Sequence, residues 1–98
     1  MTADGQAIDP ATLTLILQII MQIIGTCKKQ GASTMEIVGQ VRTGTARSRM
    51  RRKLRSELGS DEYKRRGGAK YADKIINAGM GAKVADIKGF VKESLGEE

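Results

Sequence analysis

The chain has 98 residues, enough for one domain with a modest core, and it contains no histidine and a single cysteine. These counts remove the commonest general base, the commonest metal ligand and any intrachain disulfide. We therefore expect a non-enzymatic protein in a reducing compartment, with no cofactor, no metal and no small-molecule substrate. The net charge is +6, but residues 28–70 alone carry +9, which implies a polyanionic partner: DNA, RNA or an anionic membrane surface.

An aliphatic helix from Pro10 to about Cys27 is the first predicted element. Asp9 before it can accept hydrogen bonds from free amides, and Pro10 at the first helical position loses no hydrogen bond. The preceding residues 1–8 are small and polar, and we expect them to be disordered. Residues 9–98 are then expected to form a single helical domain.

The apolar run inside this helix, residues 13–24, is twelve residues long, whereas a membrane-spanning helix needs about 20. No basic residue precedes the run, although a secretory signal would need one. We therefore expect no integral membrane insertion. The expected location is the cytoplasm or the inside of a virus particle.

The same helix has a single narrow polar stripe, because its polar residues are four apart: Thr14, Gln18 and Gln22. A helix that is apolar on nearly all sides must be covered on nearly all sides, and a short chain offers little cover. Either the helix pairs with its copy in a homo-oligomer, or it is the central helix of a monomeric bundle. The residues predicted to associate in the first case are Leu13, Ile16, Leu17, Ile20, Ile23 and Ile24.

Two helices separated by a tight turn are predicted next. Residues 33–36 (STME) form a capping box that begins a short helix ending near Val41. Residues 42–44 (RTG) are a turn, and a threonine on either side of Gly44 is expected to cap a third helix that ends near Leu58. A short capped helix, a glycine turn and a basic second helix are the outline of a helix-turn-helix.

The third helix has the strongest functional signal, because residues 42–55 contain seven basic side chains and no acidic one. Its apolar residues are four apart and predict a buried stripe that leaves most of the arginines on the opposite arc. Unopposed arginines repel one another, and phosphates relieve that cost because a guanidinium matches two phosphate oxygens. A solvated face without a partner is the alternative, which the absence of interleaved glutamate disfavours.

A second basic segment, residues 64–68 (KRRGG), overlaps the end of a short turn predicted at 61–66. It either extends a phosphate-binding track or is a plain surface turn. The basic residues predicted to contact phosphates are Arg42, Arg47, Arg49, Arg51, Arg52, Arg55, Lys64, Arg65 and Arg66.

The rest of the chain predicts two further helices, at about 69–78 and 82–95, which are separated by Gly79-Met80-Gly81. The expected fold class is therefore all-α: a small bundle of four or five short helices with a helix-turn-helix-like centre.

Residues 31–33 (GAS), 36–38 (EIV) and 44–50 (GTARSRM) together resemble the promoter-reading helix-turn-helix of bacterial sigma factors, region four. The resemblance extends over about residues 31–52. It implies groove and phosphate contacts from Thr45, Arg47, Ser48, Arg49 and Arg52.

These patterns predict a protein that binds nucleic acid, DNA more than RNA. Two other functions stay open. One is a small structural subunit of a virus particle or ribonucleoprotein, whose basic face contacts genome or RNA. The other is a peripheral membrane protein, whose aliphatic and basic segments both meet anionic lipid.

Overall fold

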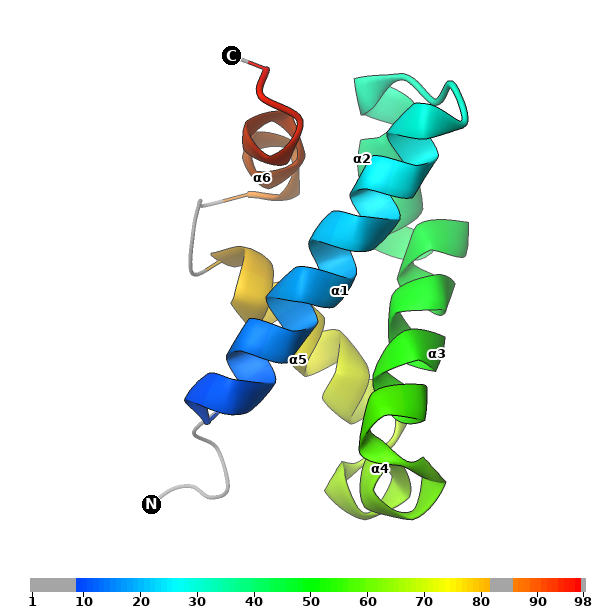
Figure 1. The fold of residues 1–98 in the computed structure, drawn as a ribbon, viewed down its shortest axis with the longest axis vertical. Coiled ribbons are helices and arrows are strands. Elements are labelled where there is room, and N and C mark those ends of the chain that lie inside the picture. Colours follow the sequence, from blue (N-terminus) through cyan, green and yellow to red (C-terminus); the bar gives the residue numbers. More distant parts are fainter. Residues whose placement is uncertain (1–8, 82–85, 98) are drawn as a thin grey trace.

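The computed structural model describes residues 9–81 and 86–97, and within these ranges it contains six helices and no strand (Figure 1). The predicted all-α bundle is confirmed. The helix number is six rather than four or five, because the turn predicted at 61–66 is a helix of its own. The expectations for residues 1–8 and for a helix start at 82 lie outside the described residues. The helices are α1 (Pro10–Lys29), α2 (Thr34–Thr43), α3 (Thr45–Leu58), α4 (Ser60–Arg66), α5 (Ala69–Gly81) and α6 (Ile87–Ser94).

Local capping patterns account for the starts of the first two helices. The Asp9 side chain accepts a hydrogen bond from the Thr12 amide, and the Ser33–Glu36 capping box is formed in both directions. The threonine cap predicted for α3 is wrong, because Gly44 occupies the cap position and no side chain caps the helix. A Cβ at Gly44 would lie 2.9 Å from the Cα of Gln40, so only glycine fits this tight junction between α2 and α3.

α1 is the central helix of the bundle and crosses in front of α5 with α3 beside it (Figure 1). Ile16, Ile20 and Ile24 are fully buried in the core of this one chain. Since a fully buried side chain has no surface to offer a second chain, the structure corrects the prediction that these three residues self-associate. The other three predicted residues are half-buried against the same core: Leu13, Leu17 and Ile23.

This arrangement matches the alternative of a central helix in a single-chain bundle. The predicted polar stripe of α1 is indeed exposed, at Thr14, Gln18 and Gln22. Oligomerisation itself stays a prediction. α1 is also long and apolar enough to cross a membrane by length and composition, with a mean hydropathy of 1.6 over 18 residues, but the core helix of a bundle meets the same criterion.

α5 continues through the glycines that were predicted to end it at residue 78. Gly79 is buried against α1, and a Cβ there would lie 3.1 Å from Cγ2 of Ile16 and 3.7 Å from Cδ2 of Leu17. A side chain at this position would therefore force Ile16 to shift by a few tenths of an ångström, so glycine suits the close approach of the two helices. Tertiary packing outweighs the poor helix propensity of glycine at this position.

Replacing Gly79 by valine is expected to lower the free energy of unfolding by about 1–3 kcal/mol, because the added methyl groups overlap with Ile16 and force the core to repack. Urea unfolding followed by circular dichroism measures this change. Gly39→Val is the matched control, because Gly39 lies exposed within α2 and a Cβ there meets nothing within 4 Å. An equal loss of stability in both variants would contradict the packing role of Gly79.

Candidate nucleic-acid interface

The buried stripe predicted for α3 comprises Ala46, Met50, Leu54 and Leu58. The first three are fully buried, and Leu58 is half-buried against the same core. The arginines of this helix do not all lie on the opposite arc, however. They divide into a group that points into the fold and a group that points into solvent. The two groups differ in their partners and therefore in what they can bind.

Arg47 belongs to the inward group and is only 7% exposed. Its Nε donates to the backbone oxygen of Val41 at 2.7 Å, its Nη1 to Oδ1 of Asp73 at 3.2 Å and its Nη2 to Oδ1 of Asn77 at 2.8 Å. The guanidinium thus joins the end of α2 to α5. Because every nitrogen of Arg47 donates within the protein, its predicted role as a nucleic-acid contact is corrected to a structural one. The position is next to the apolar stripe on the helical wheel, about 20° from Leu54, which explains why it faces inward.

Arg51 shares the same carboxylate, because its Nη1 donates to Oδ1 of Asp73 at 3.0 Å. Its Nη2 lies 3.4 Å from the hydroxyl of Ser48, which is half-buried. The Arg51 side chain retains 31% exposure. Two of the predicted contacts, Arg51 and Ser48, are therefore engaged with the protein itself.

The outward group consists of exposed arginines that make no hydrogen bond or ion pair with any described residue: Arg42, Arg49, Arg52 and Arg55. The last three are three residues apart, so they lie one after another along the solvent side of α3. Exposed Thr45 lies on the same side, and Arg42 lies at the end of α2. An open hollow of about 510 Å³ follows this side and is lined by Arg52, Arg55, Ser56 and Ser60. We call Arg42, Arg49, Arg52 and Arg55 the outward arginines.

Among the described residues, no carboxylate pairs with an outward arginine. The nearest acid in the sequence of α3 is Glu57, which lies on the neighbouring edge and pairs with Lys53 at 3.7 Å. No other acidic residue occurs in α3. The solvent side of this helix therefore presents positive charge that the described residues do not neutralise.

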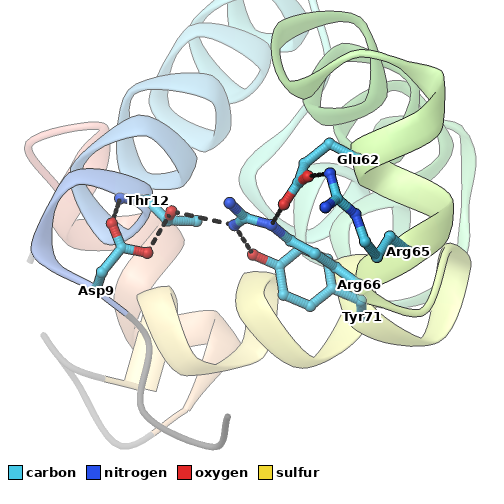
Figure 2. A network of polar contacts seen from close by, with 6 residues as sticks. All are labelled: Asp9, Thr12, Glu62, Arg65, Arg66 and Tyr71. Carbon is cyan, nitrogen blue, oxygen red and sulfur yellow. Dashed lines mark hydrogen bonds and ion pairs between the residues drawn. The ribbon is translucent and has the colours of Figure 1, made fainter.

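The second basic segment, at the end of α4, is organised around one carboxylate (Figure 2). Glu62 accepts from the Nε of Arg66 at 2.6 Å and also pairs with Arg65. The hydrogen bond from Arg66 holds the pKa of Glu62 below its usual range, so this carboxylate stays ionised near neutral pH. Lys64 is exposed and makes no hydrogen bond or ion pair with the described residues.

Arg66 also ties α4 to the two helices beside it. Its Nη1 donates to the hydroxyl of Tyr71 on α5 at 2.8 Å and lies 3.5 Å from Oγ1 of Thr12 on α1, as Figure 2 shows. The guanidinium carbon is 5.6 Å from the centre of the Tyr71 ring. Of the three basic residues predicted here, Arg66 therefore has a structural role, Arg65 is paired on the surface, and Lys64 alone resembles the outward arginines.

Sequence reasoning missed Asp73 and Asn77, the two α5 residues that hold Arg47. They are four apart, so they lie on one face of α5 and form a polar strip beside its buried isoleucines. That spacing was the one available signal. It does not identify the partner, because Arg47 is 26 residues away from Asp73. Among the described residues no group of three or more histidine, cysteine, aspartate or glutamate side chains could hold a metal ion.

The junction of α2 and α3 bears on the predicted helix-turn-helix. A single residue, Gly44, separates the two helices, whereas a helix-turn-helix has a turn of about three to four residues. Of the contacts that the sigma-factor resemblance implies, Thr45, Arg49 and Arg52 are exposed. That resemblance stays a prediction.

Comparison with protein-family models, with curated proteins and with solved structures finds no match to this chain.

Proposed function

We propose that this protein binds duplex nucleic acid, DNA in preference to RNA, through phosphate contacts from the outward arginines. One observation supports this more than any other: four exposed guanidinium groups, on α3 and the end of α2, have no carboxylate partner among the described residues. Like charges three residues apart on a helix repel one another, and phosphodiesters relieve that repulsion. The planar guanidinium fork matches two phosphate oxygens.

The aromatic residues favour a duplex over a single strand. The chain has only three, and Tyr63 and Phe90 are buried. Tyr71 is half-buried, and its hydroxyl is bound to Arg66. Proteins that hold single strands stack bases on exposed rings, and the outward side of α3 offers none among the described residues.

The shape of the basic surface favours DNA over RNA. The outward arginines lie mainly on one convex helix of 14 residues, which is about 21 Å long. The major groove of B-form DNA admits an α-helix, whereas the major groove of A-form RNA is too narrow for side chains to read. A helix face with arginines along it therefore fits B-form DNA better.

The salt dependence of binding tests this proposal. Each phosphate contacted contributes about −0.9 to the slope of log K against log salt, so the outward arginines predict a slope of about −3.6. Contacts from all nine predicted basic residues would instead give a slope of about −8. The measurement is fluorescence anisotropy with labelled duplex DNA between about 50 and 200 mM salt.

Duplex RNA and single-stranded DNA of the same sequence are the comparison ligands. The expected order of affinity is duplex DNA, then duplex RNA, then single-stranded DNA. A slope near zero, or equal binding of all three ligands at every salt concentration, would rule out phosphate contacts by the outward arginines.

A further inference from the structure

An open groove of about 470 Å³ lies between α1 and α3, next to the outward arginines. Its lining residues come from both helices: Gln22, Ile23 and Thr26 from α1, and Arg49 and Lys53 from α3. α1 and α3 pack against each other, and their ribbons are adjacent in the upper half of Figure 1. The groove therefore connects the basic side of α3 to the polar stripe of α1.

The α3 wall of this groove is cationic. Arg49 and Lys53 are four residues apart, so their side chains leave α3 on the same edge. Arg49 has no partner among the described residues, and Lys53 has a surface pair with Glu57 at 3.7 Å. Exposed ion pairs of this kind contribute little stability, so Lys53 can leave Glu57 and pair with a bound anion in the groove.

The α1 wall supplies a neutral donor. The Gln22 side chain is exposed, and its amide has no hydrogen-bond partner among the described residues. The Thr26 hydroxyl already donates to the backbone oxygen of Gln22 at 3.0 Å, which leaves the Gln22 amide as the available donor on this side. Half-buried Ile23 lies between the two walls and contributes only apolar surface.

We infer that this groove holds one backbone phosphate of the bound duplex DNA, with Arg49 and Lys53 on one side and the Gln22 amide on the other. The inference rests on the proposed function and extends the interface from α3 onto α1. Two cations and one amide donor suit an anion with several acceptor oxygens, as a phosphodiester has.

The test is Gln22→Met, which retains the approximate length of the side chain and removes its donor without changing the charge. We expect duplex DNA to bind about 3- to 10-fold more weakly, with an unchanged salt slope, because a neutral hydrogen bond is lost and no counterion is involved. The matched control is Gln18→Met, one turn earlier on the same exposed stripe and outside the groove. Lys53→Gln should weaken binding and make the slope shallower by less than about 1, because Arg49 still contacts the same phosphate.

Nuclear magnetic resonance of the unmodified protein gives an independent readout. On addition of duplex DNA, the side-chain amide signal of Gln22 should shift, and that of Gln18 should stay in place. Wild-type affinity of Gln22→Met, or an equal loss in Gln18→Met, would overturn the groove proposal. A variant that lacks Arg49, Arg52 and Arg55 separates this outcome from failure of the proposed function. If that variant binds DNA weakly, only the groove proposal fails. If it binds DNA as tightly as the unmodified protein, the proposed function fails as well.

Discussion

Replacing Arg49, Arg52 and Arg55 together by glutamine is expected to weaken binding to duplex DNA about 100-fold or more. Each phosphate contact from a charged donor is assigned about 1 kcal/mol, and three such losses correspond to about two powers of ten in affinity. The salt slope should become shallower by about 3, because three counterions are no longer released. All three residues are exposed and have no partner among the described residues, so the fold should be unaffected. Anisotropy titrations at several salt concentrations measure both changes.

The control removes the same amount of charge elsewhere. Lys29, Lys70 and Lys88 are exposed on α1, α5 and α6, and replacing them by glutamine also lowers the net charge by three. Long-range attraction falls in both variants, whereas direct phosphate contacts are lost only in the first. We expect the control to bind no more than a few-fold more weakly, about 5-fold at most. Equal effects of the two triple variants would mean that total charge, and not the solvent side of α3, determines binding.

The parts of the fold that the sequence predicts are those determined by neighbouring residues. The capping box at Ser33–Glu36 and the Asp9 cap depend on residues three apart, and both are formed. The buried stripe of α3 follows from apolar residues at intervals of four, and Ala46, Met50 and Leu54 are buried. The exposure of Arg49, Arg52 and Arg55 follows from the same helical geometry.

The parts that the sequence does not predict depend on which helices meet. The charge pattern of α3 cannot show that Arg47 faces Asp73, because that contact exists only once α5 packs beside α3. The same holds for Gly79, which continues α5 because α1 lies against it. For a related reason, the aliphatic surface of α1 is equally consistent with pairing to a second copy and with a central place in a single-chain bundle. Periodicity shows that Ile16 and Ile20 are covered, but it does not show whether the cover comes from the same chain or from another.

Replacing Arg47 by alanine is expected to lower the free energy of unfolding by about 3 kcal/mol, because it leaves the Val41 carbonyl and the Asn77 amide oxygen without their donor and opens a void between α3 and α5. For a chain of this size that loss corresponds to a fall in melting temperature of more than about 10 °C. Thermal and urea unfolding followed by circular dichroism measure the change.

Arg52→Ala is the matched control for Arg47→Ala, since both substitutions remove an arginine from the same helix and the same unit of charge. Arg52 is exposed and without a partner among the described residues, so its loss should change stability by less than about 0.5 kcal/mol while weakening DNA binding. The two variants should therefore differ: Arg47→Ala loses stability, and Arg52→Ala loses affinity for DNA. If Arg47→Ala instead unfolds like the unmodified protein and binds DNA poorly, then Arg47 contacts the ligand and its structural role is contradicted. The inward and outward arginines are thus distinguished by two measurements on one pair of variants, without any assumption about which nucleic-acid sequence is bound.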